Sequence, residues 1–284
     1  MLSSRPQEPG GAAVKRLSKK LAERRQRLLE RYDPEDLHAL RVTLRRIRSR
    51  LKQLPGKKAA RLRQELRVLA DATNAARDWD TLLASAGQLL SAQQLATLQA
   101  TLEQRQLAAR ENVTRMLQSA SWSATFERWE DYEQTHAGVP GKAVSQRRRK
   151  LARTVRKLAT ARTRALAEGS ERHWHKLRIA IKDLRYQVDA TPKRARTARE
   201  ADMLALCKQL QVSLGEWHDA VVHTRLLREL AQQPEPASDA AVTAALASLR
   251  KAVEERGLIP IEQARQTLNQ TQVLAVLGPL AEGV

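Results

Sequence analysis

The chain has 284 residues, with 51 Lys and Arg against 31 Asp and Glu, and a formal net charge of +20 at pH 7. This excess of cations predicts an anionic partner, so the candidate classes are nucleic acid, anionic lipid and phosphate polymers. No apolar run approaches the about 20 residues of a membrane span, and the N-terminus lacks the apolar core of a signal peptide.

The composition favours an all-α fold. The chain is rich in Ala, Leu, Arg, Gln and Glu, it lacks runs of β-branched residues, and only 3% of its residues are aromatic. Residues 1–11 are rich in Pro and Gly, so we expect them to be mobile. The helices expected in the first half cover residues 12–32, 37–54, 57–74, 91–116 and 121–135.

Proline and glycine mark the expected ends of these helices. Asp33-Pro34 separates the first two, and Leu54-Pro55-Gly56 ends the second, because both residue types disfavour helix continuation. A break over residues 136–142 closes the first half, and residues 232–239 (QQPEPASD) are expected to form a flexible turn. The helices expected in the second half cover residues 146–166, 174–190, 198–214, 240–255 and 260–277.

The stretch from Leu37 to Leu54 carries two parallel rows of side chains. Its apolar residues step by three and four, the spacing of a helix that buries one stripe, and they are Leu37, Leu40, Leu44, Ile47, Leu51 and Leu54. At about 100° per residue, the cations one position later form a second row beside the buried stripe. This first basic row consists of His38, Arg41, Arg45, Arg48 and Lys52.

The same pattern returns between Trp174 and Ala190. The expected inward residues are Trp174, Leu177, Ile181, Leu184 and Val188. The second basic row consists of His175, Arg178, Lys182 and Arg185. In this alignment His38 matches His175, and Arg41 matches Arg178.

A cationic row on a single helix is usually a solvated face, and that interpretation stays open. Two features argue against it here. Like charges three and four residues apart disfavour a helix by a few tenths of a kcal/mol each, and these rows lack the alternating carboxylates that relieve such repulsion. The pattern also occurs twice, so we expect a bound polyanion to offset the repulsion.

The repeat extends beyond the two rows. Asp78, in RDWD, lies about 40 residues after His38, and Asp219, in HDAV, lies about 44 residues after His175. We expect both aspartates to cap a helix or to orient a motif-helix cation. Each half is long enough for a four-helix bundle, and two bundles related by an approximate two-fold axis would bring both rows to one basic cavity.

Charge is unevenly distributed along the chain. From Gln232 onward the chain carries four Lys and Arg against six Asp and Glu, although the whole chain is strongly basic. We therefore expect the last helices to serve packing and the anion site to lie in the earlier ones.

Three motifs make the chain resemble a known family. They are HxLRxxxRRxR from His38, HxLRxxxKxLRY from His175, and LGxxxD from Leu214. With this separation they resemble the CHAD family, named for a conserved-histidine α-helical domain, over about residues 12–275. The resemblance implies a pair of four-helix bundles with pseudo-two-fold symmetry around a basic central cavity. We therefore expect one domain over residues 12–280, made of halves 12–136 and 142–280, after the segment 1–11.

The resemblance also implies a ligand. Family members bind inorganic polyphosphate and can localise to polyphosphate granules, so the resemblance implies a polyphosphate-binding module. We expect it to be non-enzymatic and cytoplasmic, for the reasons given below. Carried over by motif, His38, Arg41 and Arg45 would line the cavity in the first half. In the second half His175, Arg178, Lys182 and Arg185 would line it. We add to these candidate binding residues Arg48, Lys52, Lys19, Arg153 and Lys157.

This set of residues suits a phosphate chain. Arginine presents planar donors that pair with phosphate oxygens, and a phosphate chain offers charge without base edges. Near clustered arginines the pKa of His38 and His175 should fall in the free protein and rise when an anion binds. We therefore expect binding to strengthen as the pH falls toward 6. Each histidine also has an alternative role as a buried packing group.

The sequence does not support a catalytic reading. His173 and His175 are two positions apart and would point to different sides of a helix, so they cannot share a metal there. His218-Asp219 resembles the start of a metal-dependent phosphohydrolase signature, but no companion histidine cluster stands nearby, so we interpret it as a structural polar contact. We expect no catalytic residues, metal or cofactor. Cys207, the only cysteine, is expected to be a buried thiol, which fits a reducing cytoplasm.

Sequence-independent binding of DNA or RNA is the main alternative, because +20 on helices attracts any nucleic acid through its phosphates. The sequence has no helix-turn-helix spacing, zinc ligands or aromatic stacking platform. The tryptophans are expected in the core, and they are Trp79, Trp122, Trp129, Trp174 and Trp217. Binding to anionic membranes is a third possibility, although the cations do not lie opposite one exposed apolar face. The oligomeric state is not predicted.

Overall fold

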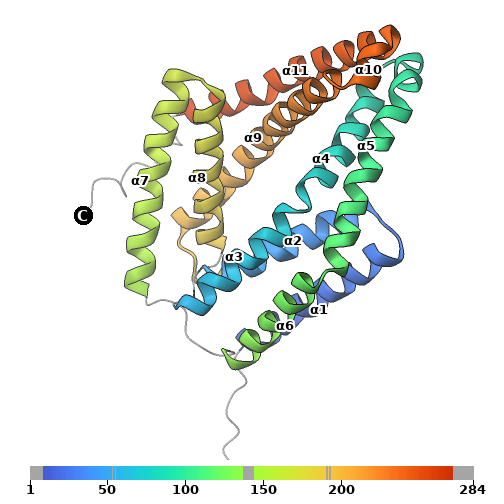
Figure 1. Cartoon of the computed structure of the whole chain (residues 1–284). Coiled ribbons are helices and arrows are strands. Elements are labelled where there is room, and N and C mark those ends of the chain that lie inside the picture. The colour runs from blue at the N-terminus through green and yellow to red at the C-terminus, as the bar shows by residue number, and fades with distance from the viewer. Residues whose placement is uncertain are drawn as a thin grey trace, which may run out of the picture. The chain divides into compact units, whose positions relative to one another are not determined.

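The structure is a computed structural model, and it describes residues 9–52, 54, 56–136, 144–189, 191 and 193–270, with the side chains of 9–16, 144–147 and 235 left out. Within these ranges every regular element is a helix, as the composition predicts (Figure 1). None of the described helices combines the length and the hydropathy that a bilayer crossing requires. The elements are α1 (Pro9–Glu30), α2 (Pro34–Leu51), α3 (Lys57–Asp71), α4 (Asn74–Leu89), α5 (Ala92–Gln118), α6 (Ala120–Thr135), α7 (Val144–Glu168), α8 (Glu171–Asp189), η1 (Lys193–Ala195), α9 (Ala198–Ala231), α10 (Pro234–Ser238) and α11 (Ala240–Asn269).

The chain divides into two compact units. Unit 1 comprises Met1–Leu83 and Ala100–Ala143, and unit 2 comprises Ala84–Gln99 and Val144–Val284. The division differs from the halves expected from the sequence, because residues 84–99 group with the second unit. One contact that ties them there is the hydrogen bond of 3.0 Å from Arg256 of α11 to the Gln88 side chain.

Unit 1 packs around the apolar stripe of α2. Leu37, Leu40 and Leu44 are fully buried, and the core that surrounds them takes residues from α1, α3, α5 and α6. Asp33 caps α2 by accepting hydrogen bonds from the backbone N–H groups of Glu35 and Asp36, at 2.8 and 3.0 Å. The expected separation of the first two helices at Asp33-Pro34 is therefore confirmed, although α2 begins at Pro34 rather than at Leu37.

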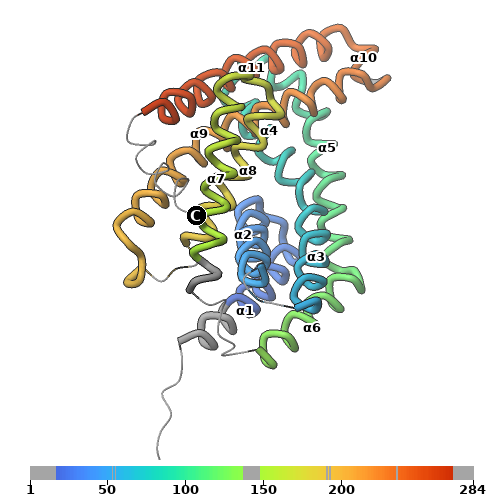
Figure 2. Tube along the Cα trace, turned by 90° about the vertical axis from the view of Figure 1, so that its left-hand side faces the viewer, coloured from blue at the N-terminus to red at the C-terminus, as the bar shows by residue number. Residues whose placement is uncertain are grey.

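Unit 2 has its main core between α7, α8, α9 and α11. Figure 2 shows α7 beside α8 and α9 beside α11, and these pairs pack directly against each other. The thiol of Cys207 lies in this core, where burial raises its pKa to about 12, so the expected buried role is confirmed.

All the tryptophans contact a core, as expected. Four of them are buried and Trp79 packs, partly buried, against the core of unit 1. The buried ones are Trp122, Trp129, Trp174 and Trp217.

Two expectations near the C-terminus were wrong. Residues 240–269 form one helix, although Pro260 led us to expect a break there. Proline removes a hydrogen bond and crowds the preceding turn, but Pro260 continues a buried stripe that includes Val253 and Ala264, and packing of α11 on α9 outweighs that cost. The stretch expected as a flexible turn contains the short helix α10. The expected mobile segment was 1–11, but residues 9–11 belong to α1. Residues 1–8 and 271–277 lie outside the described residues.

Candidate functional site

Both basic rows lie beside a buried stripe, as the spacing predicts. On α2 the apolar residues from Leu37 to Leu51 are at most 2% exposed, while the row beside them is half-buried from Arg41 onward. On α8 the residues from Trp174 to Val188 are also at most 2% exposed, and every member of the second basic row is half-buried. His38 keeps much of its surface exposed, which removes the alternative of a fully buried packing group for that residue, although the buried part of the ring lowers its pKa.

Arg41 of the first basic row is held by side-chain hydrogen bonds. Its guanidinium donates hydrogen bonds to Thr73 Oγ1 at 2.6 Å and to Asn74 Oδ1 at 2.9 Å, where α3 gives way to α4. Thr73 is itself fixed, because its hydroxyl donates to the carbonyl of Ala70 at 2.6 Å. Arg41 therefore joins the motif helix to the α3–α4 turn, in addition to any role toward a ligand.

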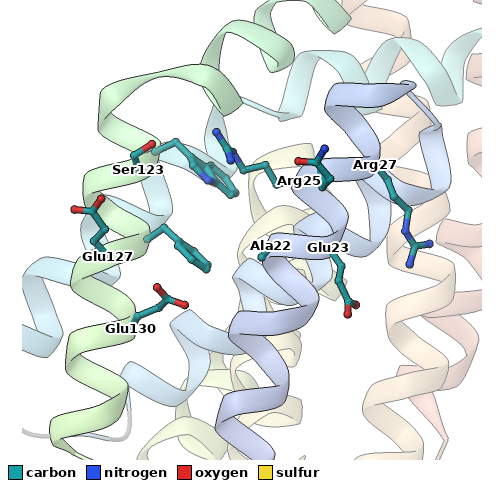
Figure 3. A pocket seen from close by; sticks show the side chains of 10 residues that line it. Ala22, Glu23, Arg25, Arg27, Ser123, Glu127 and Glu130 are labelled. Atoms are coloured by element: carbon teal, nitrogen blue, oxygen red, sulfur yellow. The ribbon is translucent and has the colours of Figure 1, made fainter.

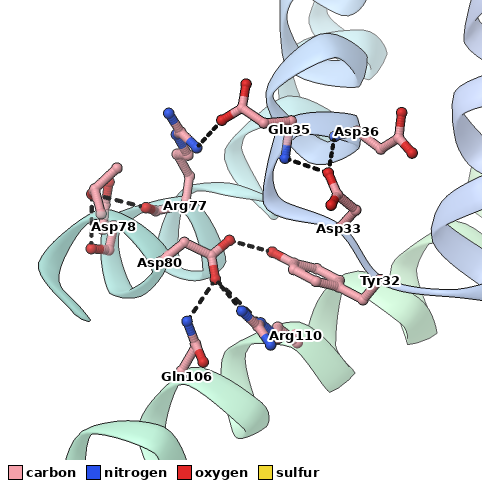
Figure 4. A network of polar contacts seen from close by, with 10 residues as sticks. Tyr32, Asp33, Glu35, Asp36, Arg77, Asp78, Asp80, Gln106 and Arg110 are labelled. Atoms are coloured by element: carbon pink, nitrogen blue, oxygen red, sulfur yellow. Dashed lines mark hydrogen bonds and ion pairs between the residues drawn. The ribbon is translucent and has the colours of Figure 1, made fainter. Parts of the chain in front are cut away.

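The beginning of α4 supplies charges that act on this row. Arg77 lies 3.7 Å from Glu35 of α2, as Figure 4 shows, and its charge also lowers the pKa of His38. Burial lowers the pKa of Arg41, and the carboxylate of Asp78 opposes that change. Asp78 thus lies where it favours the charged form of a motif-helix cation, which agrees with the role expected for it.

In unit 2 the position that matches Arg77 in the repeat is a second histidine, His218. The rings of His175 on α8 and His218 on α9 are tilted by 43° with their centroids 5.3 Å apart. Burial, followed by the charges of Arg178, His175, Lys182 and Arg225, lowers the pKa of His218 to about 4. His218 is therefore a neutral imidazole at pH 7, with donor or acceptor capacity beside the cations.

The pKa values of His38 and His175 both shift in the expected direction, but the leading cause differs from the one predicted. The sequence analysis attributed the lowering to neighbouring arginines. In the structure burial is the larger cause for both residues, and the arginine charges come second. The imidazoles lose hydration at the rim of the core, a position that the helical spacing already implies.

Arg48 and Arg185 occupy matching positions in the two rows and share an unusual feature. The Nε atom of each is buried and has no hydrogen-bond partner among the described residues. Arg185 directs another nitrogen of its guanidinium to the side-chain carbonyl of Gln211. A movement of either guanidinium toward a ligand would cost no existing Nε hydrogen bond.

Three further candidate cations lie on α1 and α7, the helices that precede the two motif helices, and they do not contact the basic rows through the polar interactions that we observe in the described part of the chain. Lys19 of α1 is 79% exposed in its side chain and lies 3.9 Å from Glu23 of the same helix. Arg153 and Lys157 are exposed on α7. Among the described residues, no hydrogen bond or ion pair that we observe joins these three side chains to α2 or α8, so their part in a site stays a prediction. Lys52 follows the last residue of α2 as its C-cap.

The sequence analysis missed His218 and Arg77 as neighbours of the motif histidines. His218 was interpreted as a structural contact, and Arg77 was not singled out. A signal for both was present, since Arg77-Asp78 and His218-Asp219 stand at the same place in the repeat. The structure places Arg77 near His38 in unit 1, and His218 near His175 in unit 2.

A closed polar network fixes the start of α2 in unit 1. Asp80 is buried and accepts hydrogen bonds from Tyr32 at 2.7 Å, from Gln106 at 3.0 Å and from Arg110 at 2.9 Å (Figure 4). The guanidinium of Arg110 also lies 4.5 Å from the centre of the Tyr32 ring. Because Tyr32 directly precedes the Asp33 cap, the network links the α1–α2 turn to α4 and α5.

A groove of about 880 Å³ between α1 and α6 does not resemble an anion site. Figure 3 shows Glu130 projecting from α6 toward α1, whereas Glu127, which also lines the groove, extends to the other side of α6. Its lining includes two arginines, but Arg25 donates to the carbonyl of Leu117 at 2.9 Å, and Arg27 lies 3.7 Å from a carboxylate oxygen of Asp36. Because both arginines already have partners, the carboxylates that line this groove would disfavour a bound polyanion.

In the part of the chain that the structure describes, no group of three or more His, Cys, Asp and Glu side chains could hold a metal ion. His173 bonds elsewhere, with its Nδ1 at 2.7 Å from the Ser170 hydroxyl and 3.2 Å from the carboxylate of Glu168. The two rows thus offer hydrogen-bond donors and positive charge, which suits binding of an anion.

Comparisons with known proteins show the family and the fold. The sequence profile of the CHAD domain matches residues 12–228. The crystal structure of the CHAD domain from the plant Ricinus communis has a TM-score of 0.72 and 26% sequence identity, and the similarity covers 95% of this chain and 90% of that one. PptA from Streptomyces chartreusis shares the fold, with a TM-score of 0.59, 22% identity, and coverage of 91% of this chain and 100% of that one. No curated protein matches the chain.

Proposed function

The chain belongs to the CHAD family, and from this premise we propose that it binds inorganic polyphosphate through its two basic rows without changing the ligand chemically. The cations of α2 and α8 contact the phosphate oxygens, with His38 and His175 as additional donors. The ligand lies in a basic cavity that the two rows share. The protein acts in the cytoplasm, at polyphosphate granules.

The observation that carries this proposal is the same construction in both units. In each unit a motif helix presents a half-buried row of arginine or lysine, led by a histidine, directly beside its buried stripe. Burial lowers the pKa of both histidines, so a site built this way gains most from a ligand that brings negative charge. A phosphate chain supplies about one negative charge per unit, which matches spaced cations.

Competition between polyanions tests the proposal directly. The full chain is titrated with long-chain polyphosphate and with duplex DNA at equal phosphate concentration, and each is used to displace the other. We expect polyphosphate to displace DNA at a phosphate concentration at least about tenfold lower, since DNA would be held only by the sequence-independent attraction of its backbone. Tighter binding of DNA would favour the nucleic-acid alternative and contradict the proposal.

Binding of polyphosphate should also depend on pH. In the free protein the pKa of His38 and His175 is below the ordinary value, and a bound polyanion raises it, so binding takes up protons. Affinity should therefore rise as the pH falls, by about tenfold between pH 8 and pH 6, if each histidine contributes part of a proton. The charged groups that act on these histidines are Arg41, Arg45, Arg77 and Glu35 in unit 1, and Arg178, Lys182 and Glu171 in unit 2.

The His38→Gln/His175→Gln variant provides the control for this pH dependence. Glutamine keeps a hydrogen-bond donor at each position but does not titrate. Isothermal titrations at pH 6, 7 and 8 should show a nearly flat affinity for the variant. Equal pH dependence in the variant and the wild type would exclude these two histidines as its source.

A further inference from the structure

Unit 2 contains a groove of about 1000 Å³ that the basic rows do not account for. It runs between α8, α9 and α11, and all its lining residues belong to this one unit. The second basic row reaches it only through His175. The groove therefore forms a separate feature, and its two walls differ in chemistry.

One wall is polar and cationic. His175 and His218 lie here with their ring centroids 5.3 Å apart, and Arg172 and Arg225 extend the same wall. The lining also includes Glu171, whose charge acts on His175. Imidazole and guanidinium N–H groups can both donate hydrogen bonds to the oxygens of a phosphate group.

An ion pair also lines the groove. Arg228 donates to a carboxylate oxygen of Glu254 at 2.9 Å, and both residues line the groove. This pair neutralises itself, so the cationic character of the groove comes from Arg172, Lys176 and Arg225, of which Arg225 lies 3.8 Å from the exposed carboxylate of Glu229.

The other wall is apolar, although it faces a strongly charged chain. Trp217, Val221 and Ile261 line it, and Leu258 of α11 lies at its edge with 65% of its surface exposed. The helices α9 and α11 come very close here, because a Cβ added to Gly257 would lie 2.8 Å from Cβ of Ala220. The close approach makes this wall a fixed part of the helix packing.

We propose that this groove binds an organic phosphate, that is, a phosphate or short phosphate chain esterified to an apolar group. The phosphate contacts His175, His218 and Arg225, and the apolar group lies against Trp217, Ile261 and Leu258. An inorganic phosphate chain would leave the apolar wall in water, so that wall favours a ligand with an organic part. The groove thus adds a ligand class that polyphosphate binding by the rows does not include.

Matched pairs of ligands test this proposal and identify the organic group. ATP is compared with inorganic tripolyphosphate, and farnesyl diphosphate with inorganic pyrophosphate, by isothermal titration with the full chain. In each pair the phosphate number is equal, so a difference measures the organic group. We expect at least one organic ligand to bind about tenfold more tightly than its inorganic counterpart, and the larger gain distinguishes a nucleoside from a hydrocarbon chain.

Two neighbouring residues supply matched variants. Leu258 lines the groove, whereas Ile259 is 63% exposed on the same helix and does not line it. Since both side chains are exposed, Leu258→Gln and Ile259→Gln should fold equally well. Leu258→Gln should lose most of the tenfold gain, and Ile259→Gln should keep it. Equal affinities for the organic and inorganic members of both pairs would overturn the proposal, and so would equal behaviour of the two variants.

Long-chain polyphosphate, titrated with the same proteins, separates this proposal from the proposed function. Neither neutral substitution alters a basic row, so both variants should bind polyphosphate as the wild type does. If polyphosphate binding is absent while ATP or farnesyl diphosphate still binds in a Leu258-dependent manner, only the proposed function fails.

Discussion

Replacement of Arg45 and Lys182 together by glutamine is expected to weaken binding of long-chain polyphosphate about a hundredfold. These residues occupy matching positions in the two rows, and both are half-buried beside the core. A hydrogen bond to a charged group contributes about 1.5–3 kcal/mol, so loss of two such contacts, with partial compensation along a flexible chain, gives about 3 kcal/mol or a factor of about a hundred. Titration calorimetry of the variant and the wild type measures this factor.

A variant with the same change in net charge provides the control. Arg250 and Lys251 are exposed on α11, and Arg250→Gln/Lys251→Gln removes two positive charges outside both rows. This control should change affinity by less than about threefold, because exposed charges act through screened, long-range attraction. Similar losses in both double variants would mean that total charge, rather than the rows, determines binding.

Arg45 and Lys182 are more informative targets than Arg41. Arg41 holds the α3–α4 turn through Thr73 and Asn74, so Arg41→Ala would combine loss of a ligand contact with loss of packing between helices. Any experiment on Arg41 therefore needs a parallel measurement of unfolding. Arg45 has no such hydrogen bond to the turn among the described contacts.

The sequence predicts the motif helices so well because one local period determines both of their properties. In α2 and α8 the apolar stripe decides what is buried, and the cations one position later must then lie at its edge. No tertiary information is needed for this step. The same holds for the start of α2, where Asp33 and Pro34 set the cap locally.

Features that depend on distant parts of the chain were beyond this kind of prediction. The contact of His175 with His218 joins α8 to α9, and no period within either helix indicates it. The wrong prediction at Pro260 has a related reason. The destabilising effect of proline on a helix is local and can be predicted, whereas the burial of Pro260 in the packing of α11 on α9 depends on tertiary structure. The shared cavity of the two rows likewise stays a prediction, since it depends on how the two units are arranged.

Loss of the Asp80 carboxylate should strongly destabilise unit 1. Asp80→Ala removes the acceptor for three side chains and leaves Tyr32, Gln106 and Arg110 with unpaired donors. Breaking a buried ion pair by removal of one partner costs about 3–5 kcal/mol, and the 26% exposure of the Arg110 side chain places this case near about 3 kcal/mol. Urea unfolding followed by circular dichroism measures the loss in free energy of unfolding.

Two further variants distinguish the network from a general effect of substitution. Tyr32→Phe removes one hydrogen bond to Asp80 and should cost about 1 kcal/mol. Asp131→Ala alters an exposed carboxylate on α6 of the same unit and should lie within about 0.5 kcal/mol of the wild type. If Asp80→Ala unfolds like Asp131→Ala, the network does not hold the α1–α2 turn. If the expected order is found, the beginning of the first motif helix depends on a buried carboxylate that the second unit replaces by Val221 at the matching place in the repeat.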